Sequence, residues 1–204
     1  MDNFAKPHDK LVRETLGRKD TACDFFQNYL PGHILELIDL DSLEISKDSF
    51  IEKELKEFFS DILYKVRFKN EEGFIYLLLE HKSYQPELIH LQLLGYIYQI
   101  YCLHVKQTKA KYLPVIIPMV LYHGKTEFKL DTNFTSVIKG PSDLLREYIP
   151  DFKFILLDLT QYTDEEIKGH VLAKAFMMAL KHTSKGDIFT AHGIIRKRNG
   201  TTIS

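Results

Sequence analysis

One segment, residues 61–84, constrains the fold of this chain more than any other. In its first arm, residues 62–69, one side of the alternation is wholly apolar and the other is mostly basic, which is the two-residue period of a β-strand. Residues 70–73 are polar and end in glycine, so they predict a turn. The second arm, residues 74–79, is apolar throughout, as in a strand covered on both faces. The segment therefore predicts a β-hairpin whose second arm lies in the middle of a sheet.

Charged residues mark the open end of this hairpin. With the predicted turn as the loop, Lys69 pairs with Phe74, and Asp61 then lies opposite Lys82. Glu80 lies two residues before Lys82 and shares its face, because side chains alternate along a strand. Opposed side chains are about 5 Å apart and diagonal ones about 7–8 Å apart. The pattern predicts two carboxylates and an ammonium group on one face, an arrangement that a slip of one residue would destroy and a slip of two would keep.

Such a cluster has a chemical use. Two neighbouring carboxylates raise each other's pKa unless a cation joins them, and carboxylate oxygens with water suit Mg²⁺. A metal ion held there can polarise a phosphoryl oxygen and help to generate hydroxide, while a lysine holds the attacking water or stabilises charge on the phosphate. The alternative is that Asp61 only begins a strand and that Glu80 and Lys82 form a solvated pair. The buried strand before Glu80 favours the functional interpretation, because an unpaired charge is costly there.

A long helix is predicted over residues 87–105, after the break at Ser83 and Pro86. It is apolar nearly all round, which predicts a central, buried helix. Gln92 and Tyr96 are four residues apart and share one side of it. A buried glutamine needs hydrogen-bond partners, so Gln92 is either a satisfied core amide or part of a site. The tyrosines of this helix suggest an aromatic core or a surface on which bases stack, and a core is favoured.

Three stretches resemble the PD-(D/E)XK nuclease superfamily: residues 61–64 (Asp-Ile-Leu-Tyr), residues 78–83 (Leu-Leu-Glu-His-Lys-Ser) and residues 92–96 (Gln-Leu-Leu-Gly-Tyr). Within it, the chain is similar to the Rpn group of recombination-promoting nucleases, also called YhgA-like transposases. The resemblance runs from about residue 8 to about residue 185. Ser60 stands where the superfamily name has a proline.

The resemblance implies a metal-dependent DNA endonuclease that promotes recombination and is associated with mobile elements. Asp61 and Glu80 match its ligands for Mg²⁺, with Mn²⁺ as an alternative, Lys82 matches its catalytic lysine, and Gln92 matches a glutamine found on the next helix in some branches. DNA is the implied partner, and a homo-oligomer is compatible with it. Many members add a glutamate from an upstream helix. Three upstream glutamates are candidates, and the sequence does not choose among them: Glu14, Glu36 and Glu54.

The order of elements predicts an α/β fold, a mixed sheet flanked by helices. Residues 113–123 form an apolar strand that suits parallel pairing beside the hairpin. His123 near its end either lines a cleft or is structural, and the structural interpretation is favoured. The remaining expectations are a helix within 2–18, a helix over 21–30 capped by Asp20, an extended piece over 34–43, a helix or strand lead-in over 46–59, a short helix over 142–148, a strand over 151–159, and a helix from 163 to about 181 opened by a capping box.

The chain has 204 residues and a net charge of −1. We expect one nuclease-like domain, residues 1–185, and a basic tail, residues 186–204, that is disordered or truncated. Its two cysteines lack metal-ligand spacing, and no long apolar span or leader predicts a membrane or export, so we expect a cytoplasmic protein. The charge is neutral evidence on DNA binding. A second hypothesis is an inactive or truncated nuclease fold that acts by binding protein or DNA, and a third is a metal-free binding protein.

Overall fold

The computed structural model describes residues 7–46, 60–80, 88–140 and 143–183. Within them, five strands form one sheet in the order β1-β2-β3-β4-β5. The strands are β1 (Ile38–Ile45), β2 (Ser60–Phe68), β3 (Glu71–Glu80), β4 (Val115–Tyr122) and β5 (Ile155–Asp158). The helices are α1 (Pro7–Leu16), α2 (Lys19–Tyr29), α3 (Gly32–Leu35), α5 (Ile89–Thr108) and α6 (Val171–Thr183), with short 3-10 turns at Phe134–Val137, Arg146–Tyr148 and Leu159–Gln161.

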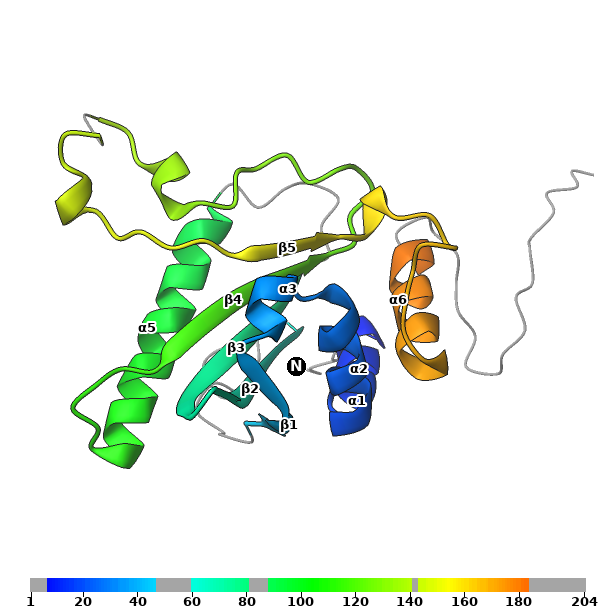
Figure 1. Ribbon diagram of the computed structural model, residues 1–204. Helices are drawn as coiled ribbons and strands as arrows, with labels where there is room; N and C mark the ends of the chain where they lie inside the picture. Colours follow the sequence, from blue (N-terminus) through cyan, green and yellow to red (C-terminus); the bar gives the residue numbers. More distant parts are fainter. Residues whose placement is uncertain (1–6, 47–59, 81–87, 141–142, 184–204) are drawn as a thin grey trace, which may run out of the picture.

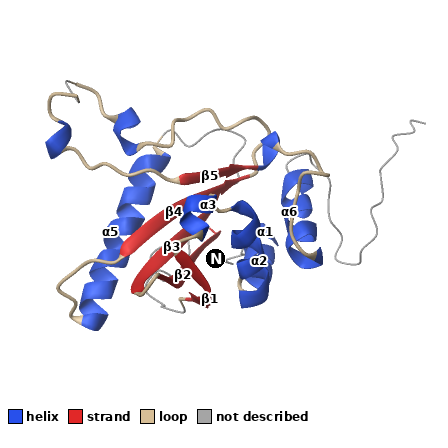
Figure 2. Ribbon diagram, in the orientation of Figure 1, coloured by secondary structure: helices blue, strands red, loops and turns tan. Residues whose placement is uncertain are grey.

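The sheet is mixed. β1, β2 and β3 are antiparallel neighbours, whereas β4 runs parallel to β3 and β5 parallel to β4. Helices α1, α2 and α6 lie on one side of it and α5 lies on the other (Figures 1 and 2). The predicted α/β class and the parallel strand beside the hairpin are confirmed. Parallel neighbours require a crossover that returns the chain to the end of the sheet where the first strand began, and this crossover is usually a helix. Here it is α5.

The apolar run of β3 is buried on both faces. Ile75 and Leu77 belong to the core formed with α1, α2 and α6, and Tyr76 and Leu78 belong to the core under α5. The prediction of a central strand is therefore confirmed. The helix α5 is also where predicted, but its predicted burial on all sides is wrong, because side chains such as Leu91 and Tyr98 are exposed.

The hairpin of β2 and β3 has a different register from the predicted one. Its turn consists of Lys69 and Asn70, with Lys69 at a φ of 55°, and Phe68 pairs with Glu71. A two-residue turn with positive φ matches the twist of the flanking strands. Of the four residues predicted as loop, Asn70 therefore stays in the turn, and Glu71, Glu72 and Gly73 extend β3 instead. As a result Asp61 pairs with Leu78, and the predicted pairing of Asp61 with Lys82 is wrong.

A close contact between strands explains why a glycine, Gly73, lies inside β3 rather than in the turn. A Cβ atom at this position would lie 2.5 Å from the ring of Phe68 and 2.8 Å from the carbonyl oxygen of Val115. Both contacts are too short for any side chain, and one of them is with backbone. The glycine therefore marks a close approach between neighbouring strands, a use of glycine that turn propensity does not reveal.

Tyr64 of β2 ties the sheet to the first helices. Its side chain is fully buried, its ring packs edge-on against Phe26 with centroids 4.9 Å apart, and its hydroxyl donates to the carbonyl oxygen of Leu16 at 2.8 Å. That oxygen is the last of α1, where helix carbonyls have no partner within the helix. Burial raises the pKa of Tyr64 above its ordinary value, because the ionised phenolate would be poorly solvated there.

We expect Tyr64→Phe to lower the free energy of unfolding by about 1 kcal/mol at neutral pH, since it removes one buried hydrogen bond. It should also flatten the alkaline loss of stability. Above the unfolded tyrosine pKa of about 10, the unfolded chain releases a proton that folded Tyr64 keeps, so stability falls by at most about 1.4 kcal/mol per pH unit. Denaturant unfolding from pH 7 to 11 measures both effects. An identical alkaline slope in wild type and variant would contradict this assignment.

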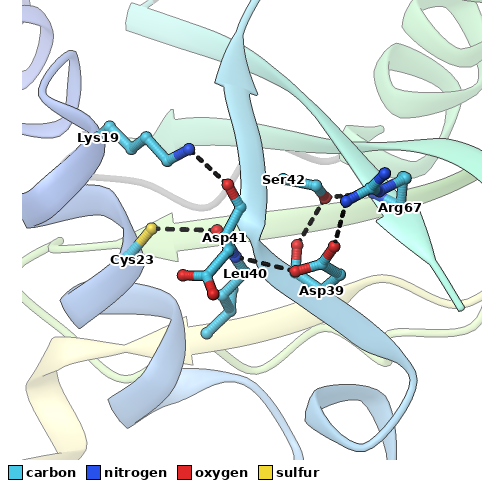
Figure 3. Close-up of polar contacts among 7 residues, drawn as sticks. All are labelled: Lys19, Cys23, Asp39, Leu40, Asp41, Ser42 and Arg67. Atoms are coloured by element: carbon cyan, nitrogen blue, oxygen red, sulfur yellow. Dashed lines mark hydrogen bonds and ion pairs between the residues drawn. The ribbon is translucent and has the colours of Figure 1, made fainter.

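A bulge interrupts β1 beside this hairpin. β1 pairs with β2 at Asp39 and again at Glu44, but the partners, Arg67 and Lys65, are only two residues apart. The hydroxyl of Ser42 fills the gap in the ladder: it accepts the Arg67 N–H at 2.8 Å and donates to the Asp39 carbonyl at 2.6 Å (Figure 3). The Arg67 guanidinium also bonds the Asp39 carboxylate at 2.6 Å and lowers its pKa. The extra residues are thus held in one conformation.

Two side chains of α2 reach the outer backbone of this bulge. Lys19 donates to the carbonyl oxygen of Asp41 at 2.5 Å, and the thiol of Cys23 donates to that of Leu40 at 3.3 Å (Figure 3). Cys23 is half-buried and burial raises its pKa. These contacts fasten α2 to the edge of the sheet.

Two predicted helix starts are wrong. The residues of the predicted capping box do form its hydrogen bonds, from Thr163 N–H to the Glu166 carboxylate at 2.8 Å and from Glu166 N–H to the Thr163 hydroxyl at 3.3 Å. They close a single turn, however, and α6 begins only at Val171, beyond Gly169 at a φ of 117°. The second wrong start is that of α2, which begins at Lys19, so the predicted cap, Asp20, lies in its first turn.

A contact from another helix sets the start of α6. The carboxylate of Asp24, on α2, accepts the N–H of His170 at 2.7 Å, just before the helix begins. The hydroxyl of Tyr29 accepts the N–H of Lys168 at 2.9 Å from the same loop. These caps come from residues far away in the sequence, which is why a local capping pattern misplaced the helix.

Three of the remaining expectations hold only in part. The extended piece expected over 34–43 is a strand only from Ile38, because Gly32–Leu35 is helical; the short helix expected over 142–148 is a 3-10 turn at Arg146–Tyr148; and the strand expected over 151–159 is limited to Ile155–Asp158. His123 is buried and its Nδ1 lies 3.2 Å from the Leu180 carbonyl oxygen on α6, as its structural interpretation predicted. Residues 47–59, Lys82, the domain boundary at residue 185 and the tail 186–204 lie outside the described part. None of the described helices combines the length and apolar character that crossing a membrane requires.

Candidate functional site

The start of β2 and the end of β3 lie at the same end of the sheet. Asp61 on β2 pairs with Leu78 on β3, and Glu80 lies two residues after Leu78. Positions 61 and 80 are therefore diagonal neighbours in the ladder. Leu63 and Leu78 belong to the core under α5, and by the alternation of each strand positions 61 and 80 are on that face too. The register differs from the predicted one by four residues. Because four is even, the predicted shared face is retained.

Gln92 comes to this region from α5. The helix runs antiparallel to β3: the Phe74 ring lies 6.0 Å from that of His104, near the end of α5, and the Tyr76 ring lies 4.9 Å from that of Tyr96. The later residues of β3 therefore approach the first turns of α5, where Gln92 lies half-buried. Its amide donates to the Tyr96 hydroxyl at 3.5 Å, a long and weak bond that leaves the amide able to bind another group.

Sequence reasoning missed one role at this end of the sheet. Glu80, Tyr122 and Asp158 form a row across β3, β4 and β5, since each pairs with the next. The carboxylate of Asp158 is buried, and its two oxygens accept the N–H of Phe128 at 2.8 Å and of Thr160 at 2.9 Å. With both oxygens engaged, Asp158 is a structural aspartate. An aspartate that ends a strand two residues before a threonine is the local signal for such a cap.

His90 is a second buried polar residue that the sequence did not single out. It lies in the first turn of α5, its Nε2 is 2.7 Å from the carbonyl oxygen of Asp131, and its ring packs edge-on against Phe154. An Nε2 atom that faces a carbonyl oxygen must carry the proton. His90 thus fastens the first turn of α5 to the loop after β4, and so supports the position of Gln92 two residues later.

The donors that could hold a metal ion here are carboxylates. No group of three or more histidine, cysteine, aspartate or glutamate side chains in the described part could hold one. The side chains of Asp61 and Glu80 are not among those described. The two positions still offer the hard oxygen donors that Mg²⁺ takes, usually one or two carboxylates plus waters, so the residues present fit that ion.

The two upstream glutamates that the structure describes, Glu14 and Glu36, are not on this face. Glu14 belongs to α1 and Glu36 follows α3, and both helices pack on the side of the sheet opposite α5. Glu54 lies outside the described residues. The choice among the three therefore stays open.

Comparison with known families bears directly on this arrangement. Residues 6–198 match the family model described as "Putative transposase, YhgA-like". The chain belongs to this family. Its match covers nearly all of the chain and includes every element of the sheet, and the mixed sheet flanked by helices is consistent with a PD-(D/E)XK-like nuclease fold. No solved structure matches the chain.

Several curated proteins are similar to the chain. Recombination-promoting nuclease RpnD of Escherichia coli O157:H7 is 32% identical over 191 residues, which cover 92% of this chain and 73% of RpnD. Recombination-promoting nuclease RpnA of E. coli K12 is 31% identical over 89% of this chain and 62% of RpnA. A third, named inactive recombination-promoting nuclease-like protein RpnE, is 28% identical over 90% of this chain and 61% of RpnE. The family is thus one of recombination-associated nucleases that includes members named inactive.

Proposed function

We propose that this chain is a metal-dependent DNA endonuclease that promotes recombination, with Asp61 and Glu80 as ligands of Mg²⁺ or Mn²⁺. The observation that carries the proposal is the register of β2 and β3. It makes positions 61 and 80 diagonal neighbours on the face under α5. Diagonal neighbours are about 7–8 Å apart, a span that two carboxylate side chains can close around one cation with oxygens at about 2.0–2.1 Å.

The residues of the chain have distinct roles in this proposal. A bound metal ion supplies polarisation of the phosphoryl group and a lowered pKa of its water. The ammonium group of Lys82 orients the attacking water and stabilises negative charge on the phosphate. The amide of Gln92 holds a water or phosphate oxygen at the edge of the site, and its own position depends on Tyr96. The buried aromatic side chains under α5 exclude water from the inner side of this site.

The relatives support the reaction class. RpnD and RpnA are named recombination-promoting nucleases, and each is similar to about nine-tenths of this chain. The chain spans 62% of RpnA. The activity of the complete relative is therefore only proposed for this chain. A second candidate is an inactive nuclease fold that acts through binding, because RpnE is named inactive and is similar over a comparable span.

Cleavage of supercoiled plasmid by the purified chain tests the proposal. We expect nicked and linear DNA with Mg²⁺ or Mn²⁺ and none with EDTA. The same plasmid bound but uncut, by well-folded protein with either metal, would contradict the nuclease and support the binding module. Gel retardation in EDTA measures that binding separately from cleavage.

A further inference from the structure

One side of α5 faces outward and is apolar along its length. Exposed residues recur there at alternating spacings of three and four, and none of them is charged. We call them the α5 stripe: Leu88, Leu91, Gly95, Tyr98, Cys102 and Val105. Leu91 is 56% exposed and Tyr98 67% exposed. A repeat of about 3.5 residues is the seam along which two helices pack in a coiled coil, so the stripe has the pattern of a helix-packing surface.

We propose that the α5 stripe is an interface between two copies of this chain, packed antiparallel about a twofold axis. The spacings along the stripe read the same in both directions, and therefore an antiparallel copy places every position of the stripe against another position of the stripe. The opposed positions are Leu88 with Val105, Leu91 with Cys102, and Gly95 with Tyr98. Each copy uses the same surface, which closes the assembly at two chains.

Gly95 supports the choice of a second copy. Glycine within a helix is less stable than alanine by about 0.5–1 kcal/mol, and a Cβ atom built at Gly95 meets nothing within 4 Å. No contact within the described chain therefore explains the glycine. In the antiparallel pair the missing side chain leaves room for the Tyr98 ring of the other copy, so a large residue lies against the smallest one.

Charge and area are compatible with such a pair. The helix α5 contains no acidic residue and one lysine, Lys106, which is not on the stripe, so two copies meet without like-charge repulsion. A covered aromatic side chain contributes about 150–250 Å², and with its aliphatic neighbours the stripe would bury on the order of 500 Å² per copy. The total of about 1,000 Å² is at the lower limit for a specific interface. We therefore expect a dimer that dissociates on dilution.

The arrangement has a consequence for the candidate site. The centre of the pair lies between Gly95 and Tyr98, so Gln92 and its symmetry mate are about 14 Å apart along the paired helices at 1.5 Å per residue. The twofold axis of the pair relates the two candidate sites to each other. The two antiparallel strands of duplex DNA are likewise related by a local twofold axis. This consequence rests on the proposed function, whereas the dimer does not.

Sedimentation of the full chain at concentrations up to about 100 µM tests the interface at an affinity typical of small contact areas. We expect dimeric wild type, and Tyr98→Glu should raise the dissociation constant at least 100-fold by placing a charge in the seam. The matched control is Tyr112→Glu, since Tyr112 is 86% exposed and is not on the stripe; it should dimerise as wild type does. A monomeric wild type would overturn the proposal, including one in which another segment of the chain covers the stripe. A dimer that Tyr98→Glu does not weaken would overturn it as well.

A cross-link provides a readout that does not depend on how Tyr98→Glu folds. Leu91→Cys should form disulfides with Cys102 of the other copy under mild oxidation, giving a covalent dimer. Within one copy the two thiols are about 16 Å apart along the helix, too far for a disulfide. Leu113→Cys, at a leucine that is 57% exposed but not on the stripe, should not cross-link. A cross-link between the two Cys102 thiols in wild type would show a parallel pair and overturn the antiparallel one.

Discussion

Asp61→Asn is expected to reduce metal-dependent DNA cleavage by at least about 1,000-fold. The substitution keeps the size of the side chain but removes the negative charge that a hard cation prefers. Polarisation by a bound metal is worth several kcal/mol, and each 1.36 kcal/mol of lost stabilisation is about a tenfold loss of rate. Rates of plasmid nicking at saturating Mg²⁺ measure the loss. Calorimetric titration with Mn²⁺ should show weakened metal binding in parallel.

The companion variants separate metal binding from catalysis. Glu80→Gln should resemble Asp61→Asn in both assays, whereas Lys82→Met should lose cleavage and keep metal binding. Asp143→Asn makes the same chemical change at an exposed position away from the sheet and should leave cleavage unchanged. Cleavage by Asp61→Asn at the wild-type rate would remove Asp61 from the site. If wild type cleaves and only this variant behaves unexpectedly, the assignment of ligands fails while the nuclease activity stands.

Asp158→Ala should produce the largest loss of stability among these variants, about 3–4 kcal/mol in the free energy of unfolding. Its carboxylate accepts two backbone N–H groups, those of Phe128 and Thr160, inside the protein. The substitution leaves both donors without an acceptor, and a buried donor without a partner costs about 1–3 kcal/mol. Denaturant unfolding at pH 7 measures the change.

Two further variants control that experiment. Asp158→Asn keeps one acceptor oxygen and should lose less stability than the alanine variant. Asp151→Ala removes an exposed aspartate that forms an ion pair with Arg146 at 3.1 Å, and exposed pairs are worth about 0–1 kcal/mol. If Asp158→Ala were no more destabilised than Asp151→Ala, the two backbone hydrogen bonds would not hold the end of β5 as described.

The hairpin was predictable because hydrophobic period and strand position agree. The alternation before the turn and the apolar run after it identify β2 and β3, and the structure confirms both. The register was not predictable from turn propensity, because Gly73 belongs to a close contact between strands while the turn itself is formed by Lys69 and Asn70. The prediction that positions 61 and 80 share a face remains correct despite the wrong register, because a register shift by an even number of residues preserves the alternation of side chains.

Contacts between distant parts of the chain explain the other differences. The start of α6 is set by Asp24 on α2, whereas the local capping pattern at Thr163 only closes a turn. The role of Asp158 depends on the N–H of Phe128, thirty residues earlier. The apolar character of α5 predicted a buried helix. Its exposed side could not be distinguished from its buried side, because apolar residues such as Leu91 and Tyr98 are also exposed. Sequence periodicity finds elements, but it does not show which of two apolar sides meets the sheet.

The bulge in β1 limits how this protein can assemble or aggregate. An edge strand ordinarily presents free carbonyl and N–H groups to which a strand of another molecule can add. Here Lys19 and Cys23 already occupy the carbonyls of Asp41 and Leu40, and the irregular backbone departs from the flat shape that an added strand needs. At the opposite edge β5 is only four residues long. Growth of the sheet from chain to chain is therefore disfavoured at both edges, which leaves helical surfaces as the route to self-association.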